Sequence, residues 1–340
     1  MLMEEGEIVM HVVERRTDSC PSTLKWHLQT LACGTVLLTL GCGFFISVSI
    51  VLYILLYTRF YPLVILYYIW VWYDTDSRAS LERRSPRVRE WAIWRYLRDY
   101  FPVRLVKTAE LDPNLNYIFC TFPHGVLGIG SGINFFTNAN KVDTVFPNHK
   151  SYLATVNYHF KLFYIREIGH ALGFCPATPK TVSNVLSRPN SVLVLIIGGA
   201  AEAFYSRPGK YTFFLSQRKG FVKMALKHGT PLVPVITFGE PDIYDQVDIP
   251  EGSWLRRCQE FIRKITGVAP IILYGNGPLP YRRQTTTVVG KPLPLEKTLN
   301  PTQEQIDELH QKFTTELVKL FEENKKLYLE NHEKVHLVIK

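Results

Sequence analysis

Two apolar segments lie near the beginning of the chain, separated by a short polar turn. Residues 28–57 contain no Asp, Glu, Lys or Arg, and residues 63–73 form a second apolar run after Arg59 and Pro62. At about 1.5 Å per residue, the first run can cross a hydrocarbon core of about 30 Å, whereas the second covers only about 17 Å. The pattern predicts a helical hairpin that enters a membrane and returns, with Arg59 and Pro62 near the bend. A single signal-anchor helix is the alternative.

Charged and aromatic residues flank this hairpin. The side after it carries Arg78, Arg83, Arg84, Arg87, Arg89 and Arg95, with Trp70, Trp72, Tyr73, Trp91 and Trp94. The positive-inside rule places the arginine-rich side in the cytosol, and the aromatic residues resemble an interfacial belt. The acidic start of the chain has no small-residue cleavage site, so we expect no removed signal peptide. We therefore predict a cytosolic N-terminal tail at residues 1–27, a membrane hairpin at 28–73 and a large cytosolic domain at 74–340.

From about residue 95 onward, short β-rich runs alternate with helical patterns. Strands are expected at residues 117–120, 192–197, 232–237, 270–274 and 285–289. A helix is expected at residues 217–228, and another begins at Thr302, which forms a capping-box pattern with Gln305. This alternation predicts an α/β domain with a mainly parallel sheet flanked by helices. In such sheets, functional groups follow the C-terminal ends of the strands.

Composition and charge narrow the class of protein. Of the 340 residues, 46% are hydrophobic and 13% are aromatic, which excludes general disorder. The net charge of +9 favours an anionic partner, such as phospholipid headgroups or the phosphates of a cofactor. No zinc spacing, helix-turn-helix pattern or RNA-binding signature supports a nucleic-acid partner. The six irregularly spaced cysteines fit a domain in a reducing cytosol.

The first candidate for chemistry follows the strand expected at residues 117–120. Residues 121–130 read TFPHGVLGIG, in which Pro123 restricts the backbone and the glycines permit positive φ and close approach. His124 is therefore a candidate general base, which would take the proton of a hydroxyl as it attacks a thioester. The amide near Gly125 would stabilise the oxyanion. An ordinary loop histidine is the alternative.

A second candidate follows the strand expected at residues 192–197, where the sequence reads Gly198-Gly199-Ala200-Ala201-Glu202. Paired glycine amides can bind an oxyanion or a phosphate. Glu202 is a candidate to orient His124 or to stabilise its charged form. Alternatively, the glycines form only a tight turn and Glu202 interacts with a helix dipole.

Basic residues and a further carboxylate complete the set. Lys219, Lys223 and Lys227 recur at helical spacing beside Arg218, and could bind the phosphates of CoA or of lipid headgroups. A solvated helix face is the alternative. Glu240 follows the strand expected at residues 232–237, either as a carboxylate that supports the site or as a turn residue.

Taken in order, these blocks resemble the type-2 diacylglycerol acyltransferase family, which includes monoacylglycerol and wax-alcohol acyltransferases. The resemblance extends over nearly the whole chain and no single motif carries it. Besides the hairpin and the segments above, the matching stretches are Tyr100-Phe101-Pro102, Pro123-His124-Gly125, Phe146-Pro147, Arg166-Glu167, Pro208-Gly209, Arg218-Lys219-Gly220-Phe221, Phe238-Gly239-Glu240 and residues 286–292.

The resemblance implies an acyl-CoA donor, no metal and no permanently bound cofactor. It also implies a location at the endoplasmic reticulum and lipid droplets. The family's His-Pro-His-Gly motif is regarded as catalytic; here Phe122 replaces its first histidine, so His124 would act alone. Asn276 stands where the family has the arginine of Gly-Arg-Gly. Other acyltransferase families have an Asp where Ile129 stands, which makes Glu202 the first candidate for the partner carboxylate.

We therefore expect an acyl-CoA-dependent O-acyltransferase in which His124, Gly125 and Glu202 are catalytic. Gly198, Gly199, Arg218, Lys219 and Lys223 would bind the donor. Diacylglycerol is the first expected acceptor, with monoacylglycerol or a wax alcohol as alternatives. Because of Phe122, a non-catalytic membrane or lipid-droplet protein is a second hypothesis, and the homo-oligomeric state is open. A hydrolase is disfavoured because the chain lacks a Gly-X-Ser-X-Gly pattern.

Overall fold

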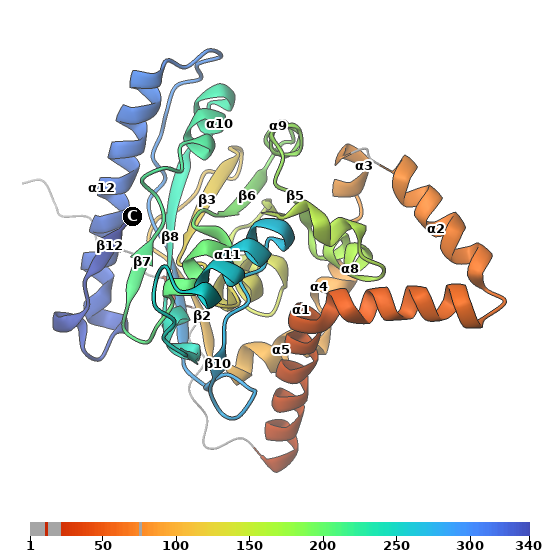
Figure 1. Ribbon diagram of the computed structural model, residues 1–340. Coiled ribbons are helices and arrows are strands. Elements are labelled where there is room, and N and C mark those ends of the chain that lie inside the picture. The colour runs from red at the N-terminus through yellow and green to blue at the C-terminus, as the bar shows by residue number, and fades with distance from the viewer. Residues whose placement is uncertain (1–10, 13–21, 75–76) are drawn as a thin grey trace, which may run out of the picture.

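The chain forms an α/β body from which a helical hairpin projects (Figure 1). The computed structural model describes residues 11–12, 22–74 and 77–340, so most of the predicted N-terminal tail, residues 1–27, lies outside the described residues.

The elements have the following bounds. The helices are α1 (Thr23–Tyr57), α2 (Tyr61–Tyr73), α3 (Ser77–Leu81), α4 (Pro86–Arg89), α5 (Ala92–Tyr100), α6 (Ile129–Ser131), α7 (Val142–Val145), α8 (Ile165–Leu172), α9 (Pro179–Leu186), α10 (Gly220–His228), α11 (Trp254–Thr266) and α12 (Gln303–Tyr328). The strands are β1 (His11–Val12), β2 (Val103–Lys107), β3 (Tyr117–Phe122), β4 (Lys150–Thr155), β5 (Phe174–Pro176), β6 (Ser191–Ile196), β7 (Tyr211–Phe213), β8 (Leu232–Phe238), β9 (Asp245–Gln246), β10 (Leu273–Tyr274), β11 (Thr285–Val289) and β12 (Leu337–Ile339).

The main sheet has eight strands in the order β1-β2-β11-β8-β3-β6-β4-β5. Its centre is parallel: β3 pairs with β8 on one side and with β6 on the other, and β6, β4 and β5 continue in the same direction. Only the pairing of β11 with β8 and that of β1 with β2 are antiparallel within this sheet. The predicted α/β class with a mainly parallel sheet is confirmed.

Most expected elements are present with small shifts in their bounds. The strands expected at residues 117–120, 192–197, 232–237 and 285–289 correspond to β3, β6, β8 and β11, and the capping box of Thr302 and Gln305 begins α12. The strand expected at residues 270–274 is wrong in extent, because only Leu273–Tyr274 pairs, and it does so with β9 outside the main sheet. The helix expected at residues 217–228 begins at Gly220.

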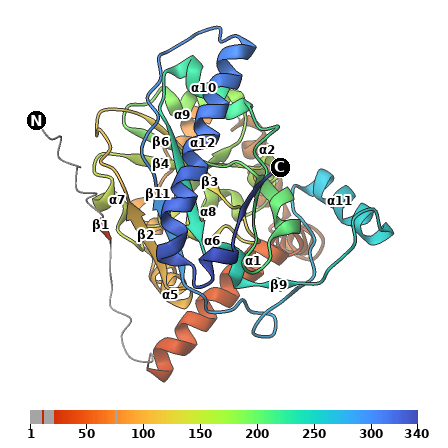
Figure 2. The same cartoon turned by 90° about the vertical axis from the view of Figure 1, so that its left-hand side faces the viewer.

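Apolar side chains fill the space on both faces of the sheet. On one face, buried residues of the sheet pack with apolar residues of α9, α10 and α12. On the other face, they pack with α7, α8 and a π-helical turn at Gly132–Phe136. Figure 2 shows α12 lying along the sheet on the first of these faces. The three-layer arrangement leaves the C-terminal ends of β3, β6 and β8 side by side at one edge.

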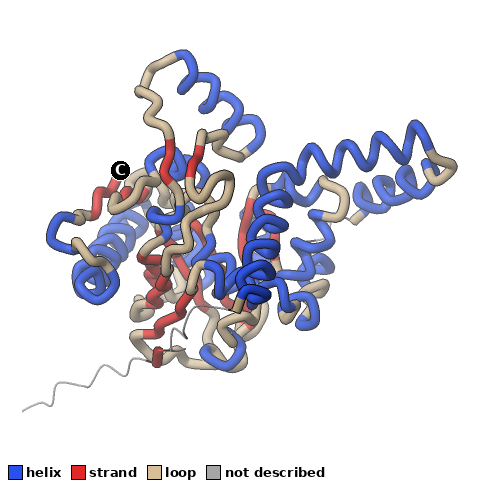
Figure 3. The backbone as a smooth tube through the Cα atoms, turned by 90° about the horizontal axis from the view of Figure 1, so that it is seen from below, coloured by secondary structure: helices blue, strands red, loops and turns tan. Residues whose placement is uncertain are grey.

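Helices α1 and α2 form the hairpin, joined by a turn at residues 58–60 that contains Arg59. Figure 3 shows that the second part of α1 leaves the body and that α2 returns beside it. By length and composition, α1 can cross a membrane, and most of its surface is exposed. That the hairpin enters a bilayer, and how deeply, stays a prediction.

The first part of α1 packs against the α/β body. It packs along α5, and its residues Gln29 and Cys33 are buried there. The guanidinium of Arg282 donates to the side chains of Gln29 and Thr30 and stacks over Trp26. These contacts therefore hold the first part of α1 against the body over several turns.

The base of the hairpin is held by a separate ionic cluster. Asp74, which follows α2, pairs with Arg83 and with Arg166 of α8. Both guanidinium groups also lie over the ring of Trp70, at 5.1 and 4.7 Å from its centroid. Part of the arginine-rich flank is thus engaged in contacts with the protein itself.

Candidate active site

Three neighbouring parallel strands bring the predicted residues together. His124 follows β3, the segment Gly198–Glu202 follows β6, and Glu240 follows β8. Because β6, β3 and β8 are adjacent and parallel, their C-terminal ends meet at one edge of the sheet. Residues separated by more than a hundred positions therefore share one site.

His124 presents its imidazole at this edge. Its side chain is partly exposed, and its Nδ1 lies 3.1 Å from the carbonyl oxygen of Gly125. A carbonyl oxygen can only accept a hydrogen bond, so Nδ1 carries the proton and Nε2 keeps its lone pair. Burial lowers the pKa of His124 below its ordinary value, which favours the neutral form near pH 7. The ring thus has the protonation state that a general base needs.

Glu202 holds the backbone of His124. Its carboxylate is 2% exposed and accepts hydrogen bonds from the peptide N–H of His124, at 2.6 Å, and from that of Phe214, at 2.8 Å. Burial raises the pKa of Glu202 to about 7. A Cβ atom at Gly198 would lie 1.9 Å from the Glu202 carboxyl carbon, so only glycine leaves room for this arrangement. The contact is with the His124 backbone, and a role for Glu202 as partner of the imidazole stays a prediction.

Glu240 holds the other end of the same loop. Its fully buried carboxylate accepts from the peptide N–H groups of Ile129, at 2.9 Å, and Gly130, at 2.8 Å. Gly125 has φ +60° and packs against this side chain, since a Cβ there would lie 2.6 Å from Glu240 Cγ. Burial raises the pKa of Glu240 to about 7. Two buried carboxylates therefore fix the loop 124–130, and the amides of Ile129 and Gly130 are already engaged.

The predicted donor-binding residues differ in how close they come to this site. Arg218 is exposed before α10, and its positive charge opposes, to a small extent, the rise that burial causes in the pKa of Glu202. Lys219 instead forms an ion pair of 2.6 Å with Asp307 of α12. Lys223 is exposed on the first turn of α10, and Gly199 has φ +61° with open space at its Cβ position.

The membrane helix reaches the turn that follows His124. Val36 and Leu37 of α1 pack into the same apolar cluster as Val126 and Leu127. Ile129 and Ile133 lie in the buried part of this cluster. Residues of α1 and of the loop that carries His124 therefore share one apolar cluster.

Comparisons with known proteins show to which family the chain belongs. The sequence model described as diacylglycerol acyltransferase matches residues 53–340, which is most of the chain. The chain belongs to the diacylglycerol acyltransferase family. No solved structure matches the chain.

Individual relatives of this acyltransferase are similar over most of their length. The 2-acylglycerol O-acyltransferase 1 of Bos taurus is 44% identical over 310 residues, which cover 88% of this chain and 92% of that protein. The Homo sapiens protein diacylglycerol O-acyltransferase 2 is 40% identical over 314 residues, covering 89% and 78%. The Homo sapiens diacylglycerol O-acyltransferase 2-like protein 6 is 40% identical over 296 residues, covering 83% and 88%.

In this acyltransferase, Phe122 occupies the position of the first histidine in the His-Pro-His-Gly motif, and its side chain lies in the core. The Phe122 side chain is completely buried and stacks on Phe213 of β7, with ring centroids 4.9 Å apart and an angle of 25°. It belongs to the core between the sheet and α10 and α12. Phe122 therefore faces the core, whereas His124 lies beyond the strand at the exposed edge.

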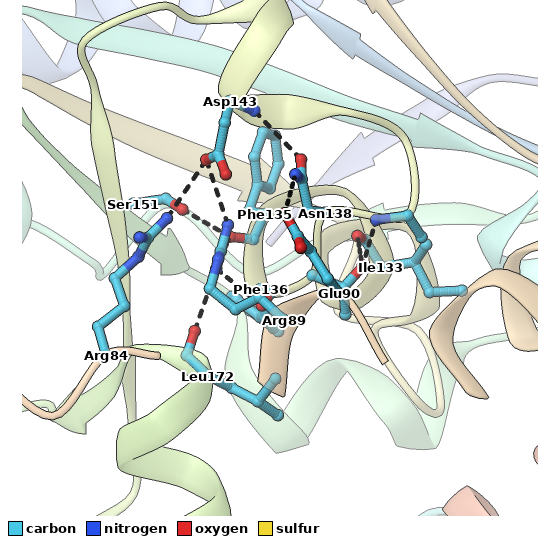
Figure 4. A network of polar contacts seen from close by, with 12 residues as sticks. Arg84, Arg89, Glu90, Ile133, Phe135, Phe136, Asn138, Asp143, Ser151 and Leu172 are labelled. Atoms are coloured by element: carbon cyan, nitrogen blue, oxygen red, sulfur yellow. Dashed lines mark hydrogen bonds and ion pairs between the residues drawn. The ribbon is translucent and has the colours of Figure 1, made fainter. Parts of the chain in front are cut away.

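A buried arginine holds the π-helical turn after the site loop, and no sequence pattern predicted it. Arg89 is 1% exposed, and its Nη1 donates to the carbonyl oxygens of Phe135, Phe136 and Leu172 (Figure 4). Burial lowers its pKa to about 9. Arg89 thus fixes the π-helical turn that continues from α6, although it belongs by sequence to the arginine-rich flank of the hairpin.

Among residues 11–12, 22–74 and 77–340, no group of three or more His, Cys, Asp or Glu side chains is placed to hold a metal ion. That the enzyme needs no metal and no bound cofactor stays a prediction.

Proposed function

We propose that this enzyme transfers a fatty-acyl group from acyl-CoA to the free hydroxyl of diacylglycerol, making triacylglycerol. The observation that carries the proposal is His124 at the C-terminal end of β3, where Glu202 binds its peptide N–H and burial lowers the pKa of its imidazole. The residues Val126 and Leu127 of the same loop share an apolar cluster with Val36 and Leu37 of α1. A bilayer-dissolved acceptor would reach the imidazole along α1.

In the proposed reaction, Nε2 of His124 takes the hydroxyl proton as the acceptor oxygen attacks the thioester carbonyl. The carbonyl oxygen becomes a tetrahedral oxyanion, for which the amides of Gly125, Gly198 and Gly199 are candidate donors; losing one such donor typically costs about 3 kcal/mol of barrier. Collapse of the intermediate breaks the carbon–sulfur bond. The CoA thiolate leaves and recovers the proton from His124, so that the products are the ester and free CoA.

The donor's phosphates would bind basic side chains beside the site. Arg218 is our first choice because its charge acts on Glu202, and Lys223 lies on the following helix. Lys219 is a weaker choice because Asp307 already neutralises it. We propose that the hairpin places the enzyme in the membrane of the endoplasmic reticulum, with the catalytic body on the cytosolic side.

Monoacylglycerol is the second candidate acceptor. It is favoured by the 44% identity to a protein named 2-acylglycerol O-acyltransferase, against 40% to one named diacylglycerol O-acyltransferase. Both acceptors present a free hydroxyl on a glycerol ester, so His124 would perform the same proton transfer on either.

Acyl transfer in microsomes tests both the role of His124 and the choice of acceptor. The microsomes contain the full chain and are supplied with labelled acyl-CoA and one acceptor at a time. We expect labelled triacylglycerol with diacylglycerol, a loss of product in His124→Ala, and unchanged product in the control His336→Ala, whose histidine is exposed before β12. Undiminished product in His124→Ala would eliminate the proposed base. Product with monoacylglycerol alone would reassign the acceptor, and no product with any acceptor would favour a binding role.

A further inference from the structure

Helix α11 presents an unusual distribution of side chains. Trp254, Phe261 and Ile265 recur at helical spacing on its outer face and are 79%, 65% and 68% exposed. The opposite face, toward the body, is polar: Arg256 and Gln259 are the buried residues there. A helix on the surface of a water-soluble domain normally has the reverse arrangement.

Polar contacts anchor the inner face of α11. The guanidinium of Arg256 stacks on Phe204, 4.0 Å from the ring centroid, and bonds to Glu260. The Gln259 amide donates to the carbonyl oxygen of Pro270 at 2.7 Å. These contacts fix the orientation of the helix, so the outward direction of the apolar residues is set by the fold.

Apart from its anchored inner face, helix α11 projects from the rest of the molecule. Figure 2 shows it projecting from the side of the sheet, and Figure 3 shows α11 and the α1–α2 hairpin as two projections from the same body. Leu255 and Ile272, at the beginning of the helix and in the segment after it, add exposed apolar surface. Apolar surface of this extent marks a site of interaction.

We propose that α11 is a second membrane contact, whose apolar face inserts into the headgroup and upper acyl region of a phospholipid bilayer. Amphipathic helices that lie in this region carry Trp and Phe on the buried side and Lys and Arg beside it. Tryptophan favours the interface because its ring is amphipathic.

The charge of α11 favours an anionic lipid surface over a second copy of the chain. The helix carries Arg256, Arg257, Arg263 and Lys264 against the single acidic residue Glu260, a net charge of +3 from four basic residues minus one acidic residue. Anionic headgroups attract such a helix. Two copies paired face to face across a two-fold axis would instead bring like charges together.

The chain also connects α11 to the membrane helix. The segment after α11 forms β10 and then reaches Pro280, whose carbonyl oxygen accepts from the Tyr100 hydroxyl at 2.8 Å. Two residues later, Arg282 holds Trp26 and Thr30 of α1. One continuous segment thus contacts α1 and carries α11, so both would meet the same bilayer.

Cysteine accessibility in the full chain tests the proposal. Phe261→Cys and Ile265→Cys report the apolar face, and Lys264→Cys is the matched control on the same helix. The purified chain is reconstituted in vesicles of phosphatidylcholine, with or without phosphatidylserine, and treated with a membrane-impermeant maleimide. Labelling is read at each position by mass spectrometry, with the parent chain correcting for Cys258 and Cys42.

We expect positions 261 and 265 to be labelled several-fold more slowly than position 264 in vesicles, with the difference larger when phosphatidylserine is present and lost in detergent. Equal rates at the three positions in vesicles would overturn the proposal. Protection that persists in dilute detergent, with disulfide cross-links between two Phe261→Cys chains, would assign the face to self-association instead. Protection in microsomes but not in vesicles would assign it to a bound protein. Because labelling does not depend on acyl transfer, these outcomes are independent of the proposed reaction.

Discussion

Replacing Phe122 by histidine restores the motif of the family, yet we expect the Phe122→His enzyme to lose stability and to gain no activity. The reason is the direction of the side chain. Phe122 is completely buried against Phe213, in the core under α10 and α12, while His124 occupies the edge of the sheet. A histidine at position 122 would therefore enter the core and would not reach the substrate hydroxyl.

The magnitude follows from the two interactions that the substitution changes. Burying a polar ring without a hydrogen-bond partner costs about 1–3 kcal/mol in proteins. The lost aromatic stack contributes about 0.5–1.5 kcal/mol beyond its buried area. We therefore expect Phe122→His to lower the free energy of unfolding by about 2–4 kcal/mol, which lowers the melting temperature by several degrees.

Thermal unfolding of the purified chain in detergent measures the stability, and acyl transfer from labelled acyl-CoA measures the activity. Phe122→Leu is the matched control, because it keeps an apolar side chain at the position and loses only the stacked ring. The reasoning would be refuted by a Phe122→His enzyme that turns over faster than the parent, above all if its pH–rate profile acquires a new limb, since a core histidine cannot exchange protons with substrate.

Three further predictions concern the groups that hold the site loop. Gly198→Ala should abolish activity and cost more than about 2 kcal/mol of stability, measured by unfolding, because the new Cβ displaces the carboxylate of Glu202 from the His124 amide. For Glu240, burial favours the protonated form, so its contribution to stability is fully present below about pH 4.5 and is lost as the pH rises to about 7. The difference in unfolding free energy between the parent and Glu240→Gln, which cannot titrate, should therefore shift by about 3 kcal/mol toward the variant from about pH 4.5 to about pH 8; a difference that is constant with pH would contradict the assignment. Arg89→Met should cost at least about 2 kcal/mol in the same assay, because the carbonyl groups of Phe136 and Leu172 lose this donor while that of Phe135 keeps only Ser151, and a melting temperature equal to that of the parent would contradict this role.

The strands and helices that sequence could predict are those with strong local signals. Four apolar runs correspond to β3, β6, β8 and β11, and the capping box at Thr302 marks the start of α12. Strand β2 (Val103–Lys107) carries two basic residues among its apolar ones, and β4 begins with an exposed lysine, so neither resembles a fully buried strand. Their place in the sheet depends on partners far away in the chain.

The candidate site could be predicted as a set of residues but not as a set of contacts. The rule that functional groups follow strand ends located His124, Glu202 and Glu240. It could not show that Glu202 bonds to the peptide of His124 or that Glu240 bonds to the amides of Ile129 and Gly130. Such bonds depend on loop conformation and close glycine packing. Arg89 was missed for a related reason, since nothing in an arginine-rich segment distinguishes the one side chain that turns inward.

The fastening of α1 to the body has a consequence for any attempt to make this enzyme water-soluble. The first part of α1 covers a surface that includes Tyr100 and Ile133, and Cys33 is completely enclosed there. Deleting the helix would bare that surface, so truncation would replace one aggregation-prone region by another. It would also remove Val36 and Leu37 from the apolar cluster that contains Val126 and Leu127, in the loop of His124. The intact chain should therefore be kept in detergent or lipid, because the first part of α1 also covers apolar residues of the α/β body.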